Sequence, residues 1–554
     1  MKYIVKLFLV LGLIYASGCS FFELEEKLDN PNAPTAASAE MDLVMNNVML
    51  EFVQFVDEVS DETMPYVRLV AMTGGENYEN QDSPASFDFM WSQAYSELMP
   101  DINLVIALAE EGGFTVHSGA AKILKAYIMF TLVDLFGDVP YSEAFQGVDI
   151  PSPKADPGEQ VYNAAFALLD EAINDLKNPL GEIGNDLYYD NNVDSWIKLA
   201  NTLKLRYYVN TRLVNPGGGA NVASLVSAGV IEDAADDFQF RYGSNRENPD
   251  SRHPYYSDGY ETGGPSWYLS NYYMFLFIGE TQTEDPRTRY YFYRQDCDET
   301  DENFFTLDCQ DGPYPFHWPD GLPYCTASSP LFGSDLSKAH SGYWGRDHGN
   351  ADGIPPDDLK RTAWGLYPAG GKFDANDCVD VENQGKDGGL GAGIQPIILS
   401  SYVYFMRAEA ALEMNSGENA REMLEKGIRA SIAKAMSFES IAPVDPAYKP
   451  DQAQIDAYVA EILDTYDNSS DKLQVVMKEY WKALQGMGLE AFNAFRRTCR
   501  PTGMQPTREA NPGDFPKTFW YPASYVNRNQ NAQQKASLTA VSVFWDTNPV
   551  GCTY

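Results

Sequence analysis

The sequence predicts a mainly α-helical protein in which tetratricopeptide-like helical hairpins pack against a loop-rich, irregular lobe. Apolar residues recur at helical spacing through residues 41–215 and again through 395–485, with short connections between the helical stretches. Residues 216–394, in contrast, are rich in Gly, Pro, Asp and Tyr and show few periodic runs. Because this irregular segment is also rich in aromatic residues and cysteines, we expect it to be ordered and functional.

Three helices are predicted in the first half of the chain. The first covers residues 119–136, where a broad apolar face is followed by Gly137 as a C-terminal cap and by Pro140 as a stop signal. The second covers residues 158–176 and the third covers 193–213, each with apolar side chains three or four residues apart. Helices of this length, joined by short loops, are expected to form antiparallel hairpins.

The second helical stretch predicts a hairpin and one further helix. Residues 400–414 and 418–436 flank the turn sequence Asn415-Ser416-Gly417, and residues 471–485 carry the last clear apolar stripe. The hairpins are similar to degenerate tetratricopeptide units, although a strict repeat of about 34 residues cannot be traced.

The first 18 residues are typical of a signal peptide, with two lysines before an apolar run that is too short to cross a bilayer. The small residues before Cys19 resemble a bacterial lipobox, in which the cysteine is acylated and becomes the mature N-terminus. The alternative is an ordinary secretory signal with an incidental cysteine. We expect residues 19–40 to form a lipidated tether and residues 41–554 to form a single domain that ends in a C-terminal segment, 486–554.

The chain has seven cysteines, so six remain when Cys19 is set aside. An even number of cysteines in an exported protein suggests disulfides. Many pairings are possible, and proximity in sequence favours Cys297 with Cys309, Cys325 with Cys378, and Cys499 with Cys552. A zinc site is not expected, because the sequence lacks a Cys-x-x-Cys motif and has only five histidines.

The net charge of −39 argues against a nucleic-acid-binding protein, since phosphate binding needs a basic surface. It also argues against electrostatic docking on anionic lipids. Aromatic residues make up 13% of the chain and hydrophobic residues 44%, which excludes a disordered acidic polypeptide. Most aromatic side chains are expected in the core, and a few are candidates for exposed platforms on which a ligand stacks.

The sequence carries no His-Glu-x-x-His motif and no Gly-x-Ser-x-Gly motif, which lowers the odds of an enzyme. No cofactor is required by the sequence. Residues 345–358 combine Asp and Asn side chains with glycines in the way a calcium loop does. The alternative is a solvent-exposed loop of Asx turns. The candidate ligands of a structural calcium ion are Asp347, Asn350, Asp352 and Asp357.

Several blocks of sequence follow one another along the mature chain. The most specific runs from Ala121 to Tyr127 and on through Asp134-Leu135-Phe136-Gly137-Asp138-Val139-Pro140-Tyr141. The other blocks are Tyr162 with residues 169–173, then residues 196–206, 284–287, 404–411, 481–484 with 488–491, 496–498, 515–516 and 521–522. Together with the lipobox, these blocks resemble the SusD/RagB family of outer-membrane nutrient-binding lipoproteins, and most of all its second SusD-like subgroup.

The resemblance implies a helical, tetratricopeptide-like scaffold on the outer face of the outer membrane. It implies that the protein caps a SusC-like, TonB-dependent transporter, captures an oligosaccharide or polysaccharide, and delivers it without catalysing a reaction. The scaffold would then contact the transporter, and the loops would bind the ligand.

Sugar binding in such proteins relies on exposed aromatic rings flanked by polar groups. We selected candidates by chemistry and by position in loops, with core packing as the alternative for each of them. The candidate ligand-binding residues are Tyr78, Asn80, Trp91, Trp267, Tyr268, Trp318 and Trp344. Trp196, Trp481 and Trp545 lie in helical or family blocks and are assigned to the core.

Two other functions stay open at this point. The first is peptide uptake, as in the RagB branch, and the second, less favoured, is a surface glycoside hydrolase. The acidic composition favours a neutral glycan over a sulfated or uronic one, unless a basic patch such as Arg287, Arg289 and Arg294 recruits an anionic ligand.

Overall fold

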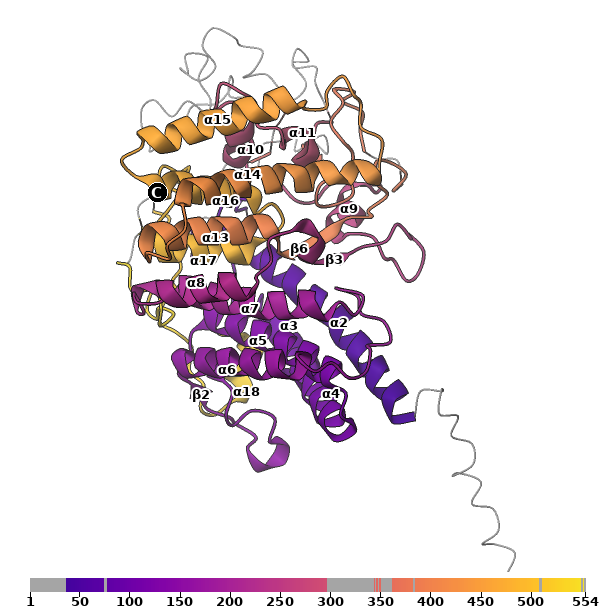
Figure 1. Ribbon diagram of the computed structural model, residues 1–554, viewed down its shortest axis with the longest axis vertical. Coiled ribbons are helices and arrows are strands. Elements are labelled where there is room, and N and C mark those ends of the chain that lie inside the picture. Colours follow the sequence, from indigo (N-terminus) through magenta and orange to yellow (C-terminus); the bar gives the residue numbers. More distant parts are fainter. Residues whose placement is uncertain are drawn as a thin grey trace, which may run out of the picture.

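The computed structural model is mainly helical, with a few short strands (Figure 1). The residues it describes are 36–73, 77–295, 343, 345–346, 348–349, 361–381, 384–507, 511–549 and 552. Most of the helices lie in stacked layers, with those of the N-terminal half in indigo to magenta and those of the C-terminal half in orange to yellow. The predicted fold class is confirmed.

The N-terminal half of the scaffold is built around α5, which is buried almost all round and packs against both α4 and α6. The elements of this half are α2 (Ala36–Thr63), α3 (Asp88–Ser92), the π-helical η2 (Gln93–Leu98), α4 (Met99–Gly112), α5 (Thr115–Phe136), η3 (Gly147–Asp149), α6 (Gly158–Leu176), α7 (Val193–Asn210), η4 (Thr211–Leu213) and α8 (Gly219–Ala228). The helix predicted over residues 158–176 is α6, with the same bounds.

The helix predicted from residue 119 begins four residues earlier, at Thr115. Gly119 lies inside α5 at its contact with α6, where a Cβ atom would stand 2.6 Å from Cγ of Leu176. This glycine therefore permits a close approach of two helices and does not mark a helix start. The other end is as predicted, since Gly137 caps α5 with a φ of 81°.

The C-terminal half repeats the hairpin arrangement, because α13, α14, α15 and α16 pack against their neighbours in turn. Its elements are α13 (Ser400–Glu413), α14 (Ala420–Met436), η7 (Ser437–Ser440), α15 (Gln452–Asn468), α16 (Lys472–Ala483), α17 (Gly488–Thr498) and α18 (Ala523–Arg528). Side chains of Asn419, Asp451 and Asp471 accept backbone hydrogen bonds at the starts of α14, α15 and α16.

The lobe is held to the scaffold by the antiparallel pairing of β3 with β6, so its two ends lie together. Its elements are η5 (Ala234–Asp236), β3 (Phe238–Arg241), α9 (Pro254–Gly259), α10 (Asn271–Ile278), α11 (Thr288–Tyr291), β4 (Phe292–Tyr293), β5 (Ala363–Trp364) and β6 (Ile394–Ile398). Two further antiparallel pairs are β4 with β5, and β1 (Val139–Pro140) with β2 (Ala155–Asp156). Although α8 falls after residue 216, it packs against α7 and α13 of the scaffold.

Buried ion pairs join parts of the scaffold that are far apart in sequence. The Arg206 guanidinium on α7 lies 3.0 Å from an Asp134 oxygen on α5 and 2.5 Å from a Glu490 oxygen on α17. Asp134 also accepts hydrogen bonds from Asn493 and from the indole N–H of Trp545. Burying these charges is tolerable because each has an opposite charge and hydrogen-bond partners. All of them come from the blocks that carry the family resemblance, apart from Asn493 and Trp545.

The disulfide between Cys499 and Cys552 is present in the structure, with Cα atoms 5.1 Å apart. It ties the end of the chain to α17. Cys378 is also disulfide-bonded. Its predicted partner Cys325 lies outside the described residues, as do Cys297, Cys309 and the lipidation candidate Cys19.

Candidate functional site

Three loops that the sequence analysis selected meet in space. Val70 pairs with Leu269 in an antiparallel bridge, and Ser270 pairs with Arg346 in a parallel one. The Gly349 N–H donates to the Met72 carbonyl oxygen across 3.1 Å. The segments at residues 70–72, 269–270 and 346–349 therefore lie side by side.

Tyr78 is fully buried in this surface, so its predicted role as an exposed platform is wrong. Its hydroxyl accepts a hydrogen bond from Arg68 at 2.9 Å and lies 3.2 Å from Nε2 of His348. Its ring stacks on Tyr66, with centroids 6.2 Å apart. A tyrosine in a polar loop thus points inward, because its hydroxyl finds buried partners and its ring finds an aromatic neighbour.

Tyr268 is likewise buried, and its prediction as a ligand platform is wrong for a different reason. The guanidinium carbons of Arg346 and Arg361 each lie 3.9 Å from the centre of its ring. Cation–π contacts at this distance occupy the ring and leave no free face for a sugar. The neighbouring Trp267 is only partly buried and keeps part of its ring accessible beside Tyr255.

Trp91 also fails as an exposed platform, since its side chain is only 7% exposed. It is clamped between Tyr95 and Tyr525, whose ring centres lie 4.5 and 4.6 Å from its own. Trp196, Trp481 and Trp545 are buried, as predicted. The candidates Trp318 and Trp344 lie outside the described residues.

Asn80 is exposed and lines a cavity of about 530 Å³ that the sequence analysis did not anticipate. The cavity is lined by Glu79, Asn80, Asp82, Ser83, Pro84, Trp520, Gln534 and Lys535, and we call it the Trp520 cavity. Trp520 is partly buried, and its indole N–H has no hydrogen-bond partner among the described residues. The cavity thus combines an accessible aromatic ring with carboxylates and amides, the groups that pack on and hydrogen-bond a sugar.

Asp82, which lines the Trp520 cavity, and Glu62, which is hydrogen-bonded to it, are unusual in their protonation. Burial raises the pKa of Asp82 to about 6, against the hydrogen bond that its oxygen accepts from Tyr66 at 2.8 Å. Burial, together with the charges of Asp82, Glu58 and Asp61, raises the pKa of Glu62 on α2 to about 9. No described lysine or arginine forms an ion pair with Glu62 or Asp82. As the pH rises, Asp82 therefore loses its proton first, near pH 6, and Glu62 loses its proton near pH 9.

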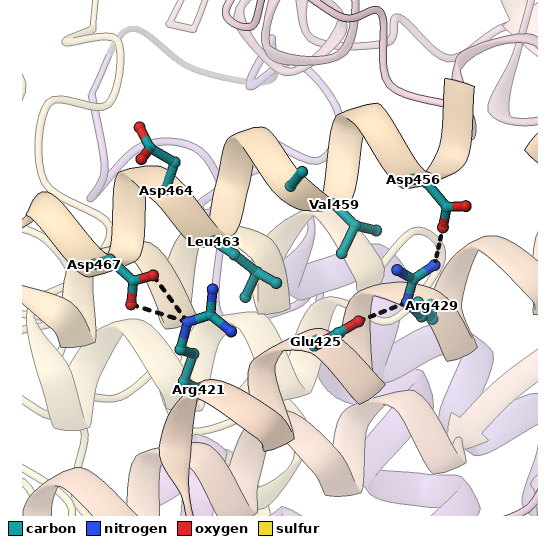
Figure 2. A pocket seen from close by; sticks show the side chains of 9 residues that line it. Arg421, Glu425, Arg429, Asp456, Val459, Leu463, Asp464 and Asp467 are labelled. Carbon is teal, nitrogen blue, oxygen red and sulfur yellow. Dashed lines mark hydrogen bonds and ion pairs between the residues drawn. The ribbon is translucent and has the colours of Figure 1, made fainter. Parts of the chain in front are cut away.

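A second hollow, between α14 and α15, has a different character (Figure 2). It measures about 410 Å³, and charged residues on its walls pair with each other, such as Arg421 with Asp467 and Arg429 with Asp456. None of its nine lining residues is aromatic, so it offers no ring on which a sugar could pack.

The described residues support neither the predicted calcium site nor a basic patch that could recruit an anionic ligand. No group of three or more His, Cys, Asp or Glu side chains in the described part of the chain could hold a metal ion. The predicted calcium ligands Asp347, Asn350, Asp352 and Asp357 lie outside it. Arg287 and Arg294, which a basic patch would need, are buried in ion pairs with Asp285 and Asp374.

Comparison with known proteins gives two family matches. A family described as "Starch-binding associating with outer membrane" matches residues 31–308. A family described as "Susd and RagB outer membrane lipoprotein" matches residues 395–544. No curated protein sequence matches the chain.

Solved structures with the same fold cover nearly the whole chain. A SusD/RagB family protein from Bacteroides thetaiotaomicron has a TM-score of 0.64 and 18% identity, with 92% of this chain and 99% of that chain covered. A chitin-binding SusD homologue from Flavobacterium johnsoniae has a TM-score of 0.62 and 19% identity, with 91% and 98% covered. A further chitin-binding protein has a TM-score of 0.63 and 18% identity, with 92% and 99% covered. At these identities the likeness establishes the fold alone.

Proposed function

Because the chain belongs to the SusD/RagB family of outer-membrane lipoproteins, we propose that it captures a glycan at the cell surface and delivers it to a SusC-like, TonB-dependent transporter. In this role the protein binds its ligand and leaves the glycosidic bonds intact. Lipidation at Cys19 provides the membrane anchor. None of the described helices is long and apolar enough to cross a bilayer.

The observation that carries the proposal is the Trp520 cavity. A tryptophan ring with an unpaired N–H can pack on the apolar face of a pyranose. Glu79, Asp82 and Asn80 lie at the same cavity and can accept or donate hydrogen bonds to the hydroxyls. Two carboxylates at the rim repel sulfated and uronic chains, so the ligand proposed is a neutral glycan.

The two chitin-binding proteins of the same fold suggest a first ligand to test, the neutral polymer of N-acetylglucosamine. Its acetamide groups offer both a donor and an acceptor, which suit the Asn80 carboxamide and the Asp82 carboxylate. Peptide uptake, the alternative within the family, would instead need the cavity to bind extended backbone.

The test is affinity electrophoresis of the purified lipid-free protein on glycol chitin, starch, xylan and a sulfated glycan. We expect retardation by a neutral polysaccharide, no released sugar, and loss of retardation for Trp520→Ala. Truncating an aromatic platform removes on the order of 1–3 kcal/mol, which is about a 10-fold to 100-fold loss of affinity. Tyr448→Ala, which removes an exposed ring that lines none of the cavities described above, is the matched control.

Three results would overturn the proposal. Migration unaffected by every polysaccharide, together with peptides co-purifying with the protein, would favour peptide uptake. New reducing ends that disappear in Glu79→Gln or Asp82→Asn would identify a hydrolase. Equal loss of binding in Trp520→Ala and Tyr448→Ala would remove the cavity from the site.

A further inference from the structure

A further cleft, distinct from the hollow between α14 and α15, lies next to the Trp520 cavity. It measures about 520 Å³, and its walls include Phe89, Trp91, Tyr95, Tyr525 and Arg528. These residues come from α3, η2 and α18, so the cleft lies on the rigid scaffold and not in the lobe. We call it the Trp91 cleft.

The aromatic side chains of the cleft are held in place before any ligand arrives. The Trp91 ring is clamped between Tyr95 and Tyr525, with centroid distances of 4.5 and 4.6 Å. The Tyr95 hydroxyl donates to the Pro140 carbonyl oxygen at 2.8 Å, which fixes that ring as well. Phe89 stands beside this wall with 58% of its surface exposed. A ligand that packs here therefore orders few protein side chains, which lowers the entropic cost of binding.

The cleft is amphipathic, and this favours a sugar over an apolar ligand. The hydroxyls of Ser92 and Ser96 have no hydrogen-bond partner among the described residues, and the exposed Arg528 forms no ion pair with any of them. An apolar side chain or a lipid tail would cover these groups without pairing them, at a cost in free energy. A pyranose offers an apolar face to Phe89 and hydroxyls to the serines and the guanidinium.

The walls of the Trp91 cleft and of the Trp520 cavity are connected by two short segments, residues 84–88 and 520–524, which we call the ridge. Pro84 and Trp520 line the cavity, whereas Asp88 and Ser524 line the cleft. The two ridge segments are joined by hydrogen bonds from Ala523 N–H to the Pro84 carbonyl oxygen and from Ser524 N–H to Asp88 Oδ1, at 3.0 and 2.7 Å. Four residues span at most about 14 Å of chain. An oligosaccharide of a few units can therefore reach from one hollow to the other.

We propose that the Trp91 cleft is a second carbohydrate subsite, which binds a distal part of the chain whose other part occupies the Trp520 cavity. The inference rests on the proposed function. Two modest subsites on one rigid surface raise the affinity for long chains over short ones, because the second binds at a high effective concentration.

The test compares chito-oligosaccharides of two and six units, and glycol chitin, by titration calorimetry and affinity electrophoresis. We expect Phe89→Ala, which removes a ring contact, and Arg528→Ala, which removes hydrogen bonds to the hydroxyls, each to weaken binding of the hexamer about 10-fold. Binding of the dimer should stay within about twofold of wild type, because the dimer fits in the Trp520 cavity alone. Tyr448→Ala again serves as the control.

The outcomes separate this inference from the proposed function. If Trp520→Ala abolishes binding while Phe89→Ala and Arg528→Ala leave the hexamer affinity unchanged, the second subsite is refuted and the function stands. If the wild-type protein binds neither oligomer nor glycol chitin, the function fails for chitin and the subsite fails with it. If the two cleft variants bind hexamer normally but no longer co-purify with a membrane transporter, the cleft is a protein interface.

Discussion

The contact between the lobe and helix α16 and the surface around the Trp520 cavity accommodate buried acids in opposite ways. At the first, Asp285 of the lobe is paired with Arg287 of the lobe and with Lys482 of α16, whose charges hold its pKa well below the usual range although burial alone would raise it. Beside the cavity, Glu62 and Asp82 form a hydrogen bond with each other and have no cation as a partner among the described residues, and burial is the largest cause that raises the pKa of each. The ion pairs thus hold the lobe on α16, whereas the buried carboxyl groups beside the cavity have no cation to offset their burial and destabilise the fold.

The largest effect is expected from breaking the ion pairs between the lobe and α16. In Arg287→Met the carboxylates of Asp285 and Glu479 each lose a partner 2.7 and 2.9 Å away. An uncompensated buried charge costs about 3–5 kcal/mol of unfolding free energy, measured by denaturant titration. Arg421→Met is the control, because its pair with Asp467 is exposed (Figure 2) and should contribute less than about 1 kcal/mol. Equal losses in the two variants would contradict the comparison.

A smaller effect is expected on ligand binding as pH changes. Since the pKa of Asp82 is about 6, this side chain is an anion above that pH and neutral below it. A charged acceptor makes the stronger hydrogen bonds, so glycan affinity should fall several-fold as the pH is lowered from 7 to 5. Asp82→Asn should bind with an affinity that is independent of pH in this range. A wild-type affinity that is flat from pH 5 to 7 would exclude Asp82 from the site.

The smallest effect is expected from replacing the buried carboxyl group of Glu62. The folded protein keeps this acid protonated up to about pH 9, whereas the unfolded chain ionises it near pH 4.5. Stability therefore decreases as the pH rises from about 4.5 to 9, because the unfolded state releases a proton that the folded state retains. Glu62→Gln should raise the melting temperature at pH 8 by on the order of 1–2 °C and have no effect at pH 4.5. A variant that melts lower at pH 8 would show that the carboxylate is stabilising.

The helices could be predicted where the apolar stripe is regular, and α6 matches its predicted bounds for this reason. The predicted start of α5 was wrong because a glycine at a helix end and a glycine at a contact between two helices look the same in the sequence. Gly119 is of the second kind. Three loops were selected one by one from their composition. That they meet in space was not predicted, since it depends on backbone bridges such as that between Val70 and Leu269.

The site residues were harder to predict because burial depends on partners distant in sequence. Tyr78 is buried by His348 and Arg68, and Tyr268 by Arg346, none of which its own loop reveals. Trp520 was missed because it lies beside a family block and far from Asn80 in sequence. The signal available was an unassigned tryptophan next to a polar C-terminal segment, and only the fold brings residues 79–84 to it.

The pairing of β3 with β6 has an evolutionary consequence. Because Phe238 lies opposite Ile398, and Arg241 opposite Ile394, the intervening chain leaves the scaffold and returns to it at one place. An insert with adjoining ends can change in length or be exchanged as a cassette without moving the helices that carry it. The exchange must retain Asp285 and Arg287, which lock the cassette to Glu479 and Lys482 of α16. Such an exchange would leave the Trp520 cavity and the Trp91 cleft in place, since none of the residues that line them lies between β3 and β6.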